Sequence, residues 1–315
     1  MTQQTNLALK KLQGIKPKGV KPRLEITNLE YLLDVEKRVI DRVHNRKTEA
    51  DKDFYKKLVT TNTIEKCTAF REILSLWLNE YFADNSFSET DLEAYVLTRS
   101  ADYDLNPTNS VLAGIYSGCL LSRLTKQNVE INKPTEITIF GGGHKFDYLF
   151  FFAKNVDKLF VDGFQGTNLC AYISYGGTLN LLSLTNCEGN GTAESIQPER
   201  GNPKLFVLVN HKGDYGARTQ RLLNGGLFVS YNCKGEWTPE VCPYADYDLI
   251  AERIDKTIDN GFIANPHEHS NKKILASGEL FTIAQLTKAI SKSSPDKIVD
   301  LANKIYNINK QRCER

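Results

Sequence analysis

Two cysteines and a histidine recur at nearly equal spacing in the middle of the chain, and thiolate and imidazole are common zinc ligands. They are Cys187, His211 and Cys233, separated by 24 and 22 residues. If each lies on its own rung of a stack of β-strands, rungs about 4.8 Å apart place the Cys187 and Cys233 backbones roughly 9.6 Å apart. A zinc ion needs both sulfurs about 2.3 Å away, and a disulfide needs Cα atoms within about 7 Å. The spacing favours a half-buried structural ladder, with a metal or thiolate site as the alternative.

An asparagine precedes each residue of that column, and these asparagines are Asn186, Asn210 and Asn232. Asparagine tolerates the left-handed backbone conformation that tight turns need, and stacked amides can hydrogen-bond to one another along a ladder. We therefore interpret the asparagines as a second structural ladder. We expect its loss to lower stability without affecting binding.

Both columns belong to an imperfect repeat of 22 to 24 residues, in which an apolar run leads into a polar turn and a glycine. Clear copies occupy residues 159–166, 182–189, 206–213 and 228–235, and a fainter copy occupies residues 136–142. Repeats of this length are typical of solenoids, and alternate apolar residues of stacked strands would form a shared core. The pattern predicts a β-solenoid of four to five rungs over residues 136–237, with a β-sandwich or barrel as the alternative.

Glycines and small residues recur in the turns of this repeat. They are Gly163, Gly166, Ala171, Gly176 and Gly177 in one rung, Gly189, Gly191 and Ala193 in the next, and Gly213, Gly216, Ala217, Gly225 and Gly226 in the third. This arrangement resembles the right-handed β-solenoid found at the C-terminal end of the large chain of glutamate synthase and in one of the subunits of formylmethanofuran dehydrogenase. That family usually keeps a second turn glycine where this chain has its asparagine column. The resemblance covers about a third of the chain and implies a structural element that contacts other subunits and has no catalytic residues of its own.

Helical patterns flank the repeat on both sides. Residues 25–126 predict a helical domain, because Thr27 and Glu30 have capping-box spacing and apolar residues then recur on one face. Residues 244–310 predict a C-terminal helical cap, with helices over 247–258 and 282–290 and a last helix that begins at Pro295. Such helices would cover the open strand edges of a solenoid. The predicted fold class is α+β, a central right-handed β-solenoid flanked by N-terminal and C-terminal helical regions.

The first 24 residues carry positive charge and no acidic residue. The charged side chains are Lys10, Lys11, Lys16, Lys18, Lys21 and Arg23. Prolines and glycines between them indicate a flexible basic arm. Such an arm could contact an acidic protein partner or nucleic acid, and a merely solvated tail is the alternative.

The composition is ordinary for a globular protein. The chain has 315 residues, a formal net charge of +2, 41% hydrophobic and 25% charged residues. It holds neither an apolar stretch of about 20 residues nor a secretory signal pattern, so we expect no membrane association. Seven cysteines without a Cys-x-x-Cys pair favour a reduced, cytoplasmic setting.

The sequence contains none of the motifs that mark a hydrolase elbow, a zinc protease helix or a paired-carboxylate site. We therefore predict no catalytic residue, no metal and no cofactor. The predicted function is a non-catalytic cytoplasmic scaffold or partner-binding protein with a protein partner. One alternative is an enzyme with a ligand groove between the helices and the solenoid. The other is a nucleic-acid-binding protein that uses the basic arm.

Overall fold

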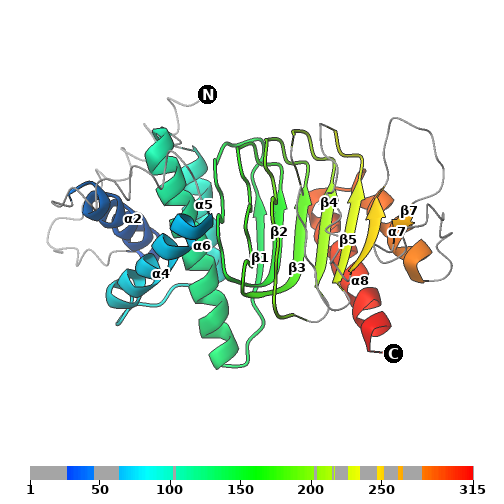
Figure 1. Cartoon of the computed structure of the whole chain (residues 1–315), viewed down its shortest axis with the longest axis horizontal. Coiled ribbons are helices and arrows are strands. Elements are labelled where there is room, and N and C mark those ends of the chain that lie inside the picture. The colour runs from blue at the N-terminus through cyan, green and yellow to red at the C-terminus, as the bar shows by residue number, and fades with distance from the viewer. Residues whose placement is uncertain are drawn as a thin grey trace, which may run out of the picture.

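A computed structural model describes residues 27–45, 64–101, 104–201, 204–214, 216, 226–234, 247–251, 262–264 and 279–314 of the chain. Within the described residues the first helices are α2 (Asn28–His44), α4 (Ile64–Tyr81), α5 (Glu89–Ala101) and α6 (Pro107–Glu130). They gather at one end of a stack of strands, and α7 (Glu279–Ile290) and α8 (Pro295–Cys313) lie toward its other end (Figure 1).

The strands form one sheet in chain order. They are β1 (Glu136–Phe140), β2 (Asn155–Asp162), β3 (Thr178–Thr185), β4 (Leu205–Val209), β5 (Gly226–Tyr231), β6 (Tyr247–Ala251) and β7 (Phe262–Ala264). The first six pair in parallel, and β7 runs antiparallel to β6. Leu159 pairs with Leu182, Leu182 with Phe206, and Phe206 with Phe228, so the register follows the repeat. The predicted α+β fold, a parallel β-solenoid flanked by helices, is confirmed.

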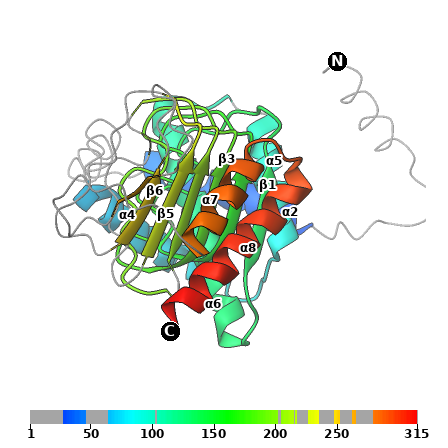
Figure 2. The ribbon, with the colours of Figure 1, turned by 90° about the vertical axis from the view of Figure 1, so that its right-hand side faces the viewer.

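Both faces of this sheet are buried, as is usual for parallel strands. Leu159, Leu182 and Phe206 point into the solenoid and join the main hydrophobic core. The alternate residues Leu181 and Val207 face the other way and belong to a second core, with apolar side chains of α7 and α8. Figure 2 shows these two helices lying along the strands. The C-terminal helices therefore cover a face of the sheet, where the sequence predicted that they would cover its end.

The wall opposite the sheet has an uncommon backbone. Every second residue in it has positive φ, for example Tyr148, Phe150 and Phe152 at 64°, 54° and 57°. Non-glycine residues rarely adopt this left-handed conformation. Backbone hydrogen bonds between rungs hold it here, as the Phe152 amide donates to the Ala171 carbonyl at 3.1 Å and the Cys170 amide to the Leu149 carbonyl at 2.7 Å.

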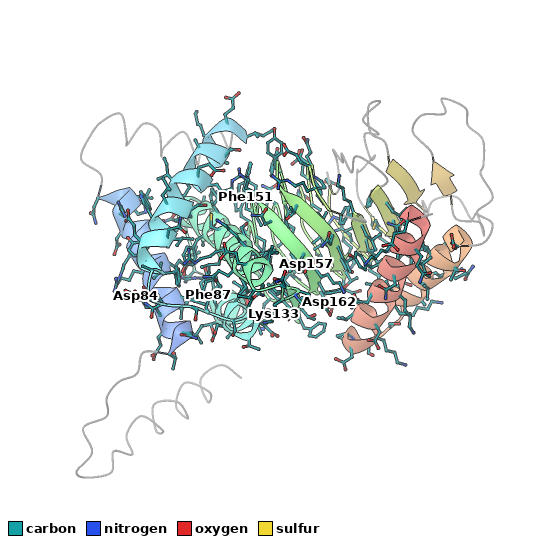
Figure 3. All side chains as sticks on the ribbon, turned by 90° about the horizontal axis from the view of Figure 1, so that it is seen from below. Asp84, Phe87, Lys133, Phe151, Asp157 and Asp162 are labelled. Atoms are coloured by element: carbon teal, nitrogen blue, oxygen red, sulfur yellow. The ribbon has the colours of Figure 1, made fainter. Side chains whose placement is uncertain are left out.

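The first helices pack directly on the first rung of the solenoid. Thr27 and Glu30 form the capping box that begins α2. In α6, a Cβ on Gly118 would lie only 2.4 Å from the Phe151 carbonyl oxygen, so glycine permits this close approach. Figure 3 shows Phe151 beside the helices, and Phe151 shares one hydrophobic core with α6 residues such as Leu120. The helical region and the solenoid therefore share a core.

The prediction of a helix over residues 247–258 is wrong for its first residues. Residues 247–258 have a helical pattern in the sequence, but residues 247–251 form β6, which pairs in parallel with β5. Pairing satisfies the backbone groups that the edge of β5 would otherwise expose. The rest of that segment, residues 252–258, lies outside the described residues, as does the predicted basic arm over residues 1–24. None of the described helices is long and apolar enough to cross a bilayer.

Candidate functional site

The asparagine column forms a chain of side-chain hydrogen bonds across the rungs. Asn186, Asn210 and Asn232 all have positive φ, at 52°, 56° and 55°. The Asn232 amide donates to Asn210 Oδ1 at 2.5 Å, and the Asn210 amide donates to Asn186 Oδ1 at 2.8 Å. The Asn186 amide in turn donates to Asp162 Oδ1 at 2.6 Å, at the end of β2, which Figure 3 labels. These amides hold neighbouring turns in register.

His211 is fully buried beside this chain. Its Nδ1 lies 3.1 Å from the Cys187 carbonyl oxygen, so Nδ1 carries the proton in the neutral ring. Among the described residues Nε2 makes no hydrogen bond, and a Cβ on Gly216 would lie 2.8 Å from it. Burial lowers the pKa of His211 to about 4. The imidazole is therefore uncharged at neutral pH and packs closely.

Cys187 and Cys233 are free thiols on either side of the His211 rung. The Cys187 thiol donates to the Thr185 carbonyl at 3.3 Å, and the Cys233 thiol donates to the Tyr231 carbonyl at 3.5 Å. Burial raises the pKa of each thiol to about 12, which keeps both protonated. Within the described part of the chain, no three histidine, cysteine or acidic side chains gather closely enough to hold a metal ion.

A shallow groove follows the asparagine ladder, with a cavity volume of about 310 Å³. It is lined by Asn186, Cys187, Glu188, Asn210, Lys212, Asn232, Lys234 and Ser291. The Asn210 amide donates to the Ser291 carbonyl at 3.0 Å and so ties the ladder to the residue that follows α7. The ladder amides are thus already engaged within the protein.

A second cavity, here called the junction cavity, lies between α4, α6 and the residues that lead into β2. Its volume is about 340 Å³. The lining residues are Arg71, Ser75, Leu78, Asn79, Cys119, Ser122, Arg123, Lys126, Gln127, Glu130, Lys154 and Asn155. Four of these side chains are cationic and one is acidic, so the cavity concentrates positive potential. Sequence reasoning missed this site because its residues come from separate elements, and each fits an ordinary helical or strand pattern.

Arg71 is the most deeply buried cation of the junction cavity, with 5% of its surface exposed. One terminal nitrogen donates to the Tyr175 carbonyl at 3.3 Å, and the other donates to Glu72 at 2.8 Å. The Nε donor is buried and has no hydrogen-bond partner among the described residues. Because protein atoms cover this Nε, Arg71 contributes a fixed positive charge to the lining of the cavity.

Arg123 repeats this arrangement on α6. Its terminal nitrogens donate to Asn79 Oδ1 at 2.7 Å and to the Phe82 carbonyl at 3.0 Å. Its Nε is also buried and has no hydrogen-bond partner among the described residues. Burial lowers the pKa of the Arg123 guanidinium, because the charge is partly removed from water. Both arginines are thus held in place by bonds from their terminal nitrogens.

The nucleophiles of the junction cavity are not activated. Burial raises the pKa of the Cys119 thiol to about 12, so it is protonated at neutral pH. The Ser75 hydroxyl donates to the Arg71 carbonyl, and the Ser122 hydroxyl donates to the Gly118 carbonyl, each at 2.8 Å. Neither hydroxyl donates to a base that could accept its proton during attack. The arrangement suits binding of an anion better than covalent chemistry.

Comparison of the chain with protein-family models, with curated proteins and with solved structures found no match. The likeness of residues 136–237 to the glutamate synthase solenoid therefore rests on the turn pattern alone. The six cations of the basic arm lie outside the described residues. Among the described residues, those that bear on function are in the junction cavity and the helices around it.

Proposed function

We propose that this protein is a non-catalytic cytoplasmic scaffold or partner-binding protein, and that a protein partner docks on α4 and α6. The main observation in favour of docking on these helices is the position of exposed apolar side chains. Among the described residues, the exposed large hydrophobics are Leu76, Val129 and Ile131, at 64%, 63% and 69% exposure. Leu76 lies on α4, Val129 lies on α6, and Ile131 directly follows α6.

A single exposed apolar residue is normal on a protein surface, and we propose that these three side chains, on or next to two helices that pack together, contribute to one interface. The α4 and α6 helices pack against each other. The same helices rest on a solenoid whose sheet is buried on both faces, which gives the docking surface a stiff support. A structural solenoid that contacts other subunits is also what the turn pattern implies. The cysteine composition supports the cytoplasmic setting.

The test is co-purification from the native host after chemical crosslinking, followed by reconstitution with the purified partner. We expect the double variant Leu76→Asp, Ile131→Asp to lose the partner while keeping the wild-type circular dichroism spectrum. The control Arg38→Asp changes an exposed charge on α2 and should retain the partner. Retention of the reconstituted partner by the folded double variant would refute docking on this surface.

An enzyme with a ligand groove between helices and solenoid is the second candidate, because the junction cavity lies in that position. Its thiol and hydroxyls are protonated or bonded to the backbone, which weighs against this function. Cys119→Ser and Ser75→Ala distinguish the two. They would abolish turnover by an enzyme that uses the Cys119 thiol or the Ser75 hydroxyl as its nucleophile, whereas they should leave partner binding by a scaffold unchanged.

Nucleic-acid binding through the basic arm stays a prediction from the sequence. It requires that deletion of residues 1–24 remove the binding. It also requires that affinity fall steeply between about 50 and 200 mM salt, because cations on the arm would displace counterions from phosphates. Binding that survives either change would exclude this function.

A further inference from the structure

We infer that the junction cavity is a binding site for a phosphoryl group, carried by free phosphate or by a small phosphorylated molecule such as a sugar phosphate. This site goes beyond the proposed function, because it concerns the cavity and not the apolar surface of α4 and α6. The inference rests on the fixed guanidinium groups of Arg71 and Arg123, on the excess of cations, and on the size of the cavity.

The protein holds both guanidinium groups in place. Arg71 is almost completely buried. The terminal nitrogens of both groups are already fixed by Tyr175, Glu72, Asn79 and Phe82. An anion that enters the cavity therefore meets guanidinium groups that are already oriented. Preorganised donors of this kind lose little freedom when they bind.

The charge balance favours a dianion. Arg71, Arg123, Lys126 and Lys154 line the cavity, and Glu130 is the one carboxylate among the described lining residues. Glu72, next to the cavity, pairs with Arg71 and, at 3.5 Å, with Lys154. Arg123 and Lys126 have no carboxylate partner within salt-bridge distance in the described part of the chain. A phosphoryl group carries close to two negative charges at neutral pH, whereas a carboxylate carries one.

The number of available donors also fits a phosphoryl group. Its three terminal oxygens accept several hydrogen bonds at once, and arginine is well suited to bind them. The Lys126 ammonium and the Asn79 amide NH2 make no hydrogen bond among the described residues, and the guanidinium groups of Arg71 and Arg123 line the same cavity.

The size and lining of the cavity indicate room for more than one phosphate. Its volume of about 340 Å³ is in the range of small-molecule sites. Leu78 supplies an apolar surface, and the amides of Gln127 and Asn155 can bind hydroxyl groups of a sugar. We therefore expect a sugar phosphate to bind more tightly than inorganic phosphate.

The test is isothermal titration calorimetry on the full chain, with inorganic phosphate, glucose 6-phosphate, acetate and a phosphoserine peptide as probes. We expect saturable binding of both phosphates, with acetate at least about tenfold weaker. Glucose 6-phosphate that binds more tightly than phosphate identifies a phosphorylated small molecule as the ligand, and equal binding identifies free phosphate. A phosphoserine peptide that binds more tightly than both would overturn the proposal in favour of a macromolecular ligand.

The variants assign the binding to the cavity. Lys126→Glu changes an exposed side chain that makes no hydrogen bond among the described residues, so it should fold normally and weaken phosphate binding at least about tenfold. Arg123→Gln should have the same effect. The control Arg38→Gln removes an exposed arginine that pairs with Asp34 on α2, and it should leave binding unchanged. Unaltered phosphate affinity in folded Lys126→Glu and Arg123→Gln, or no saturable binding by the wild type, would refute the site.

Discussion

The asparagine ladder can be tested by two substitutions at its centre, Asn210→Gly and Asn210→Leu. The Asn210 side chain takes part in three hydrogen bonds, with Asn186, Asn232 and the Ser291 carbonyl. Its backbone has φ of 56°, in the left-handed region. Glycine removes the hydrogen bonds but keeps this conformation at no steric cost, whereas leucine removes the bonds and also strains the backbone. The pair therefore separates the two contributions.

The hydrogen bonds of Asn210 are partly exposed to solvent, so each should contribute near the lower end of the usual 0.5–1.5 kcal/mol. We expect Asn210→Gly to lower the free energy of unfolding by about 2 kcal/mol. Leucine in the left-handed region costs about 1–2 kcal/mol more, so Asn210→Leu should lose about 3–4 kcal/mol.

Urea unfolding followed by circular dichroism measures these differences as shifts of the midpoint at constant slope. Phosphate binding at the junction cavity should be unchanged in both folded variants, because Asn210 does not line that cavity. Wild-type stability of Asn210→Gly would show that the ladder bonds contribute nothing. Equal stability of the glycine and leucine variants would show that the left-handed backbone is not maintained.

Two further predictions concern His211 and a turn glycine. Burial lowers the pKa of His211 to about 4 from its usual value near 6.5, so the neutral ring favours the folded state above pH 6.5. As the pH drops from 6.5 toward 4, the free energy of unfolding should fall by about 1.4 kcal/mol per pH unit. The free energy of unfolding of His211→Gln, measured between pH 7 and 5, should fall less steeply; equal slopes would contradict the assignment. A Cβ on Gly177 would lie 1.8 Å from the Lys154 carbonyl oxygen, so Gly177→Ala should cost several kcal/mol, roughly 3 or more. Gly143→Ala, which meets no atom within 4 Å but has φ of 87°, should cost only about 1 kcal/mol in the same urea assay; equal losses would exclude the steric explanation.

The sheet of the solenoid could be predicted because its information is repeated in every rung. Leu159, Leu182, Phe206 and Phe228 occupy one column of the repeat and pair in that register in the structure. A one-residue slip would move all of them to the opposite face of the sheet. The last parallel strand, residues 247–251, lacks the repeat pattern, and a short apolar run does not distinguish strand from helix.

The wall opposite the sheet could not be predicted from residue types. Asparagine at a turn signals a left-handed conformation, but Phe150, Phe152 and Tyr172 also adopt positive φ, and aromatic residues do not favour it. Hydrogen bonds between rungs impose this backbone, for example from the Tyr172 amide to the Glu194 carbonyl at 2.6 Å. The cause of the conformation lies in the neighbouring rung, and the local sequence contains no signal for it.

The junction cavity follows from the way that α6 meets the solenoid. Gly114 and Gly118 bring the middle of α6 against the first rung, and the Ser122 hydroxyl still accepts a hydrogen bond from the Lys154 amide at 2.7 Å. After Ser122, the α6 side chains of Arg123, Lys126, Gln127 and Glu130 line the junction cavity. From the sequence alone, Arg123 and Lys126 are expected on the solvated face of a helix. They form a candidate binding site because tertiary packing brings Arg71 beside them in the lining of one cavity.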